Sequence, residues 1–370
     1  MKYLLYVIPV IVFLVLYHLA TLNGVFMQDF DSLQFKHAAY SWVATGVLKE
    51  ADGGDFIHWP PLYPIVLSFF NWNVGVGAKY FHFFCLSFSL CIWISIYSKF
   101  ITDKYLLWGL VLLNASSLHL IYIGRFLWVE SLFVLLLSIS LQQYISWKGW
   151  KSFLIVTCTG ILLALLRTAS ILFWMNIFLM IAILYKNKNF YVKVSTFILP
   201  FLVWLGYRQF ISERGSFGKV APWDTGLFFE QLQMHTTWYL GFLRECFLPF
   251  VSYHILFEIS FLLLIGWWFY IENRSRKLPK EVALIAGVSF LYIIELIIVT
   301  VVKGFGNSSE VFRHLAVVSV GIYFVIGFLF QRVLIRNMDN RKYLYFFVVV
   351  VITLNFIRSC HQIGSWNNCL

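Results

Sequence analysis

The sequence predicts an all-α, polytopic membrane protein with about eleven transmembrane helices. Two features of composition and one of pattern support this fold class. Of the 370 residues, 61% are hydrophobic and only 12% are charged, which is about half the charged fraction of an ordinary soluble domain. The mean hydropathy is +0.79. Runs of roughly 17 to 25 apolar residues recur along the whole chain, and each is long enough to cross a bilayer as a helix.

The expected spans cover the chain from end to end, so residues 1–370 are interpreted as a single transmembrane domain. The first apolar run starts directly after Met1-Lys2 and lacks an Ala-x-Ala cleavage site, which favours a retained helix over a removed signal peptide. The expected spans are residues 3–22, 79–98, 105–121, 127–145, 153–167, 169–185, 191–208, 249–270, 282–302, 312–331 and 343–358.

Charge is distributed unequally between the loops. With the N-terminus in the cytoplasm, the short inner loops receive over half of the 28 Lys and Arg residues. This is the asymmetry of the positive-inside rule, and it places the C-terminus outside the cytoplasm. The rule also explains most of the net charge of +11, which therefore indicates a lipid bilayer and no nucleic acid as partner. The outer side receives the acids Asp29, Asp31, Glu50, Asp52, Asp55, Glu130, Glu213, Asp224, Glu230, Glu245 and Glu310.

Two long outer loops are expected, at residues 23–78 and 209–248. In the first, residues 32–47 are predicted to form a surface helix that Asp31 or Ser32 caps and Gly46 ends. Prolines then force an extended entry into residues 65–72, which are too few to span and are interpreted as an interfacial helix. The second loop mixes Arg, Lys and Trp, a combination that suits a lipid-phosphate head group and equally suits an ordinary aromatic belt.

Particular motifs of the first loop resemble a known family. The motif DSLQF at residues 31–35 is followed by Ala38-Ala39, by Gly46 and by HWPPLYP at residues 58–64. This order resembles the C-type glycosyltransferase (GT-C) superfamily of polytopic membrane enzymes, in particular bacterial members like the protein O-mannosyltransferases and aminoarabinose transferases. Weaker similarity lies in RFLWVES at 125–131, LLRT at 165–168 and EVFRHL at 310–315.

The resemblance implies an inverting transfer of a sugar from a polyprenyl-phosphate donor to a lipid, glycan or protein acceptor outside the cytoplasm. It also implies the inner (plasma) membrane of a bacterium. Asp31 is the hypothetical general base, with Asp29 as the alternative and a simple helix N-cap as the structural interpretation of Asp31. Phe35 and Ser32 stand where relatives often have Tyr and Glu. The loss of a hydroxyl and a carboxylate makes the divalent metal of some relatives doubtful, so no metal ligand is assigned and no cofactor is certain.

Three arginines near outer helix ends are candidates for holding the donor phosphate, with Arg313 and Arg167 ahead of Arg125. An arginine at that depth is costly unless it is paired or used, and its planar donors match phosphate oxygens. Pairing with Glu130 or Glu310 is the alternative interpretation. His58, Tyr63 and Glu130 are predicted to contact substrate.

Other functional classes remain open at the sequence level. A transporter or flippase of lipid-linked glycans often shows internal repeats, and none is visible here. A lipid-linked oligosaccharide polymerase would carry its large loop late in the chain, whereas the distinctive loop here is the first. A non-catalytic membrane partner built on the same fold is the remaining alternative.

Overall fold

The structure, a computed structural model, describes residues 3–27, 29–57, 59–70, 72–167, 170–185, 189–212, 278–303, 308–336 and 341–368. Within these ranges every regular element is a helix, and extended pairing is limited to two isolated β-bridges. The all-α fold class is therefore confirmed. The helices are α1 (Leu4–Ala20), α2 (Phe30–Thr45), α3 (Leu62–Ser68), α4 (Val74–Phe100), α5 (Lys104–Ala115), α6 (Leu118–Arg125), α7 (Glu130–Ile145), α8 (Trp150–Leu166), α9 (Ser170–Leu184), α10 (Asn189–Ser195), α11 (Ile198–Ser212), α14 (Lys280–Lys303), α15 (Ser308–Arg336) and α16 (Arg341–Asn368).

Apolar helices of membrane-spanning length are present in the described ranges. Five helical stretches are long and apolar enough to cross a bilayer, namely 74–100, 104–125, 190–210, 313–332 and 345–367. Four shorter apolar helices, α1, α7, α8 and α9, coincide with further expected spans. The expected span 249–270 lies outside the described residues, as does the second long loop beyond residue 212. The number of spans therefore stays a prediction.

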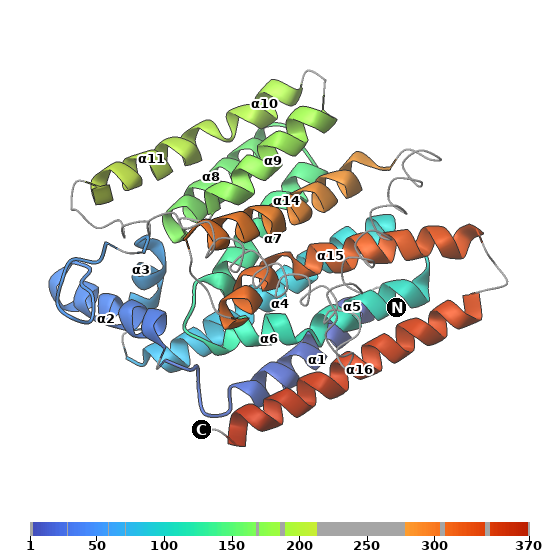
Figure 1. The fold of residues 1–370 in the computed structure, drawn as a ribbon, viewed down its shortest axis with the longest axis horizontal. Coiled ribbons are helices and arrows are strands. Elements are labelled where there is room, and N and C mark those ends of the chain that lie inside the picture. The colour runs from blue at the N-terminus through green and yellow to red at the C-terminus, as the bar shows by residue number, and fades with distance from the viewer. Residues whose placement is uncertain are drawn as a thin grey trace.

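The helices form an elongated bundle, with α2 and α3 gathered at one end of it (Figure 1). The last turn of α16 lies beside the last turn of α1, where the side-chain amide of Asn367 donates to the Leu19 carbonyl at 3.1 Å. Since α1 runs along the bundle from the N-terminus, the two chain ends lie at opposite ends of the bundle (Figure 1). An N-inside, C-outside topology requires this arrangement, although which end faces the cytoplasm stays a prediction.

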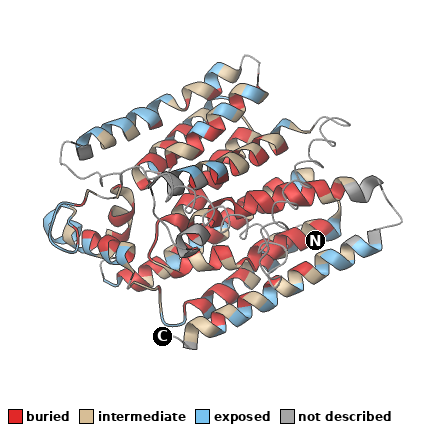
Figure 2. Ribbon diagram, viewed as in Figure 1, coloured by how far each residue is buried: buried red, intermediate tan, exposed pale blue. Residues whose placement is uncertain are grey.

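The core lies along α4, α7 and α15, whereas α11 and α16 are more exposed (Figure 2). The spanning window of α15 is 89% buried, compared with 22% in α16. Polar side chains inside the core pair across helices. The Ser138 hydroxyl on α7 lies 2.7 Å from that of Ser89 on α4 and accepts from the Trp93 indole at 3.0 Å. Such pairing is required where no water is available to the polar groups.

The helix of the first loop begins earlier than the sequence indicated. Asp29 is its N-cap, with its carboxylate accepting from the Ser32 amide at 3.2 Å. The prediction that Asp31 or Ser32 caps a helix over residues 32–47 was therefore wrong. Asp29 has the extended backbone of a capping residue and reaches the amide three positions on. The predicted end is confirmed, since Gly46 adopts the left-handed conformation with φ 70°.

The short helix α3 also begins earlier than predicted, at Leu62 instead of residue 65. Prolines were expected to keep this stretch extended. Pro61 sits at the N-cap, however, and Pro64 falls within the first turn. Backbone amides of a first helical turn have no intrahelical acceptor, so a missing N–H costs nothing there. The two prolines start this helix instead of delaying it.

Candidate active site at the end of the bundle

Four charged side chains from separate elements meet at the end of the bundle where α2 begins. Arg313 on α15 pairs through one terminal nitrogen with Asp31 in the first turn of α2. Its Nε donates to Glu130 Oε1, at the start of α7, at 2.6 Å. Arg167, at the C-cap of α8, donates to the same Glu130 oxygen at 2.5 Å. Residues far apart in sequence thus form one ionic cluster, defined here as Asp31, Glu130, Arg167 and Arg313.

The members of the ionic cluster differ in their access to solvent. The Glu130 side chain is 0% exposed, those of Arg313 and Arg167 are 10% and 12% exposed, and that of Asp31 is 21% exposed. A buried carboxylate is stable only when paired, and two guanidinium groups supply the pairing. The position of Glu130 at a helix N-terminus adds the favourable end of the helix dipole. Asp31 is the member nearest to solvent.

Trp128 links the ionic cluster to the start of α2. Its indole ring lies under the Arg313 guanidinium, with 4.4 Å from Cζ to the ring centroid. Its Nε1 donates to Asp29 Oδ2 at 2.7 Å. No sequence pattern distinguishes Trp128 from the other aromatic residues, although it lies inside the motif at residues 125–131. One side chain therefore holds both a cluster arginine and the N-cap of the helix that carries Asp31.

Tyr63 anchors the proline-rich segment to the bundle. Its hydroxyl lies 2.7 Å from His82 Nε2 on α4, and His82 Nδ1 lies 3.1 Å from the Gly124 carbonyl. A carbonyl only accepts, so His82 Nδ1 carries the proton and Tyr63 donates to Nε2. Burial, together with the nearby Glu130 carboxylate, raises the pKa of the Tyr63 phenol well above its usual range. The phenol therefore stays a protonated donor, and its predicted substrate contact stays a prediction.

The remaining predicted residues fall in different places. Arg125 packs on the end of α16, with its Cζ 4.7 Å from the Trp366 ring centroid and its Nη2 donating to the Trp366 carbonyl at 3.4 Å. The structure thus brings Arg167 and Arg313 together and gives Arg125 a different set of neighbours. His58 lies outside the described residues. Asp29, the alternative base, caps the start of α2 through its Oδ2, and its catalytic role stays a prediction.

Within the described part of the chain, no group of three His, Cys, Asp or Glu side chains is arranged to hold a metal ion. Several buried polar atoms on or next to the ionic cluster do lack a hydrogen-bond partner among the described residues. They include both acceptors and hydroxyl donors, as a polar ligand would require. These atoms are Asp29 Oδ1, Ser32 Oγ, Glu130 Oε2, Ser131 Oγ and His314 Nδ1.

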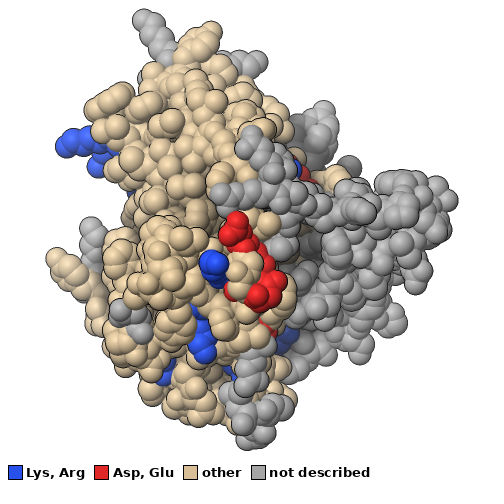
Figure 3. Space-filling model, turned by 90° about the vertical axis from the view of Figure 1, so that its left-hand side faces the viewer, with Lys and Arg blue, Asp and Glu red and all other residues tan. Residues whose placement is uncertain are grey.

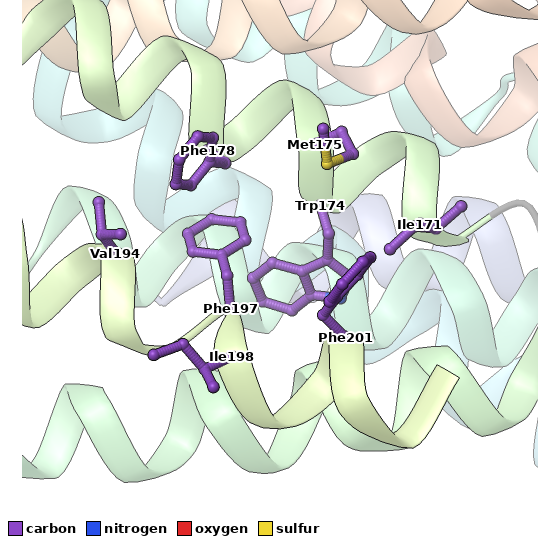
Figure 4. A pocket seen from close by; sticks show the side chains of 8 residues that line it. All are labelled: Ile171, Trp174, Met175, Phe178, Val194, Phe197, Ile198 and Phe201. Atoms are coloured by element: carbon purple, nitrogen blue, oxygen red, sulfur yellow. The ribbon is translucent and has the colours of Figure 1, made fainter. Parts of the chain in front are cut away.

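The face that carries α2 and α3 gathers acidic side chains, with basic ones beside them (Figure 3). An apolar groove of about 310 Å³ lies between α9 and the α10–α11 pair. It begins at Ile171, four positions after Arg167, and follows α9 as far as Phe178 (Figure 4). The groove therefore starts near Arg167 in the chain, and the Arg167 carbonyl accepts from the Ser170 amide at the start of α9 at 3.1 Å. Its lining is Ile171, Trp174, Met175, Phe178, Val194, Phe197, Ile198 and Phe201.

The fold is similar to that of ArnT, which confirms at the level of fold the resemblance inferred from the first loop. Two crystal structures of ArnT, the aminoarabinose transferase, from Cupriavidus metallidurans are similar to this chain. The apo structure has a TM-score of 0.59 and the structure bound to undecaprenyl phosphate one of 0.58, each at 8% sequence identity. At that identity the likeness shows the fold alone.

The alignments cover 88% of this chain but only 59% and 60% of the two ArnT chains. The chain therefore spans about 60% of the length of the proteins it resembles. The sequence matches no protein-family profile, and no curated protein is similar to it in sequence. The likeness to ArnT thus rests on three-dimensional structure.

Proposed function

We propose that this protein is a membrane glycosyltransferase that moves a sugar from a polyprenyl-phosphate donor to a surface-glycan, lipid or protein acceptor. The ionic cluster is the single observation that carries the proposal. It combines a partly exposed carboxylate with two guanidinium groups at one end of a GT-C fold. A carboxylate suits proton abstraction, and paired guanidinium groups suit a phosphate.

In the proposed reaction, Asp31 takes the proton from an acceptor hydroxyl, and the acceptor oxygen forms a bond to the anomeric carbon. The bond from that carbon to the phosphate oxygen breaks, and its electron pair leaves on the polyprenyl phosphate. A single displacement of this kind inverts the anomeric centre. Arg313 and Arg167 stabilise the negative charge on the leaving phosphate, because fixed donors are most effective where charge develops.

The donor lipid is inferred from the groove beside α9. Its lining is apolar throughout, which suits an isoprenoid chain. The groove begins four residues after Arg167, so a phosphate at that arginine is in reach of a chain lying along α9. ArnT has been crystallised with undecaprenyl phosphate, and we extend that lipid class to this chain. The proposed location is a bacterial inner membrane with the site on the extracytoplasmic side.

Sugar transfer by purified protein in liposomes tests the proposal. Radiolabelled polyprenyl-phosphate hexoses and pentoses are supplied to the wild type, to Asp31→Asn and to Asp52→Asn. Asp52 is an exposed acid of the same loop, and its carboxylate accepts from the Gly54 amide at 2.9 Å. We expect transfer or donor hydrolysis by the wild type and Asp52→Asn and at least a hundred-fold loss in Asp31→Asn, as for removal of a general base.

Each other outcome contradicts a stated part of the proposal. Full activity of Asp31→Asn refutes the base assignment and moves it to Asp29 or elsewhere. Donor lipid that crosses the liposome bilayer without sugar transfer favours a flippase. Absence of both turnover and donor binding for every donor favours a non-catalytic partner on the same fold.

A further inference from the structure

Arg313 has two carboxylate partners that come from different elements. Asp31 is carried by the first turn of α2, and Glu130 begins α7. Both pair with the same guanidinium group, one through a terminal nitrogen and one through Nε. A base held in this way has one carboxylate oxygen already occupied by a guanidinium hydrogen bond, so that oxygen cannot at the same time accept a hydrogen bond from an acceptor hydroxyl. The arrangement that binds Asp31 therefore opposes its use as a base.

The charges of the ionic cluster also balance. Two arginines face Asp31 and Glu130, so the paired charges sum to zero. A phosphate adds one or two negative charges to this site. An unbalanced charge among largely buried side chains, as Glu130, Arg167 and Arg313 are, is costly, so a phosphate that binds Arg313 has to replace a carboxylate that is already there.

Burial and connectivity decide which carboxylate is replaced. Glu130 is 0% exposed and is shared by Arg167 as well as Arg313. Asp31 is 21% exposed and pairs with Arg313 alone among the ion pairs of the described residues. The Trp128 ring lies against the Arg313 guanidinium, so the arginine keeps its place when one partner leaves. Asp31 is therefore the carboxylate that can be displaced at the lower free-energy cost.

We propose that the donor phosphate displaces Asp31 from Arg313, and that the displaced carboxylate becomes the general base. This inference rests on the proposed function and adds an order of events to it: donor binding comes first and activates the base. Without donor, Asp31 stays paired and the site does not deprotonate the acceptor. Asp31 is thus both a competitor of the donor phosphate and the group that the donor releases.

If Asp31 competes with the donor phosphate for Arg313, then removing the charge of Asp31 must tighten donor binding. The measurement is equilibrium binding of radiolabelled undecaprenyl phosphate to protein in lipid nanodiscs. We expect Asp31→Asn to bind about ten-fold more tightly than the wild type, as for loss of one charged hydrogen bond that opposes binding. Asp31→Glu keeps the competing charge and should stay within about two-fold of the wild type, as should Asp52→Asn.

The outcomes separate this inference from the proposed function. If the wild type binds undecaprenyl phosphate but Asp31→Asn binds equally well or more weakly, displacement is refuted while the glycosyltransferase proposal stands. If neither protein binds the lipid, the lipid-phosphate donor is refuted and displacement with it.

A second measurement needs no variant and so does not depend on the folding of one. Carboxyl-specific footprinting of the wild type, read by mass spectrometry, should show several-fold faster labelling of Asp31 when undecaprenyl phosphate is added. Asp52 serves as the internal reference within the same loop. Unchanged or slower labelling of Asp31 in lipid-saturated protein would overturn the proposal.

Discussion

Glu130 is expected to be the most important single charge for the stability of the bundle end. The substitution Glu130→Gln keeps the size of the side chain and one acceptor oxygen but removes the charge. In the wild type, Glu130 Oε1 accepts from Arg167 at 2.5 Å and from Arg313 at 2.6 Å. Breaking a buried ion pair typically costs about 3 to 5 kcal/mol. Because both arginines retain slight exposure and Arg313 keeps Asp31, we expect the lower end, about 3 kcal/mol.

The assay is denaturant unfolding in detergent micelles, with the free energy of unfolding compared between variants. Glu295→Gln is the matched control. Glu295 is a second carboxylate within the bundle, but its partner is neutral, since the Asn176 side-chain amide donates to it at 2.7 Å. A glutamine accepts that bond equally well, so the loss should stay below about 1 kcal/mol. A loss in Glu130→Gln no larger than in Glu295→Gln would refute the reasoning.

A double-mutant cycle extends this test to the origin of the loss. Glu130→Gln combined with Arg167→Gln removes both charges of one pair. If the cost comes from an unpaired buried arginine, the double variant should lose less stability than the sum of the single variants, by about 1 to 2 kcal/mol. Strict additivity would show that the pair is not coupled.

Three further predictions follow from neighbouring contacts. Trp128→Leu removes both the ring under Arg313 and the donor to Asp29, so sugar transfer should fall about ten-fold, whereas Trp128→Phe keeps a ring and should lose less; equal losses would argue against the ring contact. Asp29→Ala removes the N-cap of α2 and should lower the free energy of unfolding by about 1 kcal/mol. Asp29→Asn keeps the cap and should retain sugar transfer. Loss of transfer in Asp29→Asn would instead favour Asp29 as the general base. Gly124→Ala would place its Cβ 2.6 Å from the Tyr17 ring, so a loss of about 1 to 3 kcal/mol is expected in the same unfolding assay, and a neutral result would mean that the ring moves.

The helices were largely predictable because length and hydrophobicity suffice for a membrane span. The run at residues 79–98 became α4 and that at 312–331 lies within α15. The ends of helices were harder to predict from the sequence, since several residues near each end could act as caps. Asp29, Asp31 and Ser32 all satisfy the preference for capping residues. Only the backbone conformation of Asp29 decides between them.

The composition of the site was predictable in part, and its pairing was not. Asp31, Glu130, Arg167 and Arg313 were candidates because each is a charged residue near a predicted outer helix end. The pairing of Asp31 with Arg313 joins residues 282 positions apart. No local pattern encodes such a contact, because it depends on how distant helices pack and rotate. The sequence placed Arg313 and Arg167 ahead of Arg125 as candidates, but it did not show that Arg125 packs on Trp366 while the other two arginines share Glu130.

The backbone bridge between Phe26 and Phe126 has a practical consequence for engineering this fold. The Phe26 amide donates to the Arg125 carbonyl at 2.7 Å, and the Leu127 amide donates to the Phe26 carbonyl at 3.2 Å. These two hydrogen bonds hold the segment before α2 against the segment before α7. A chimera that exchanges only the first loop would separate these partners. The smallest exchangeable unit is therefore the first loop together with residues 125–130, transplanted as one piece.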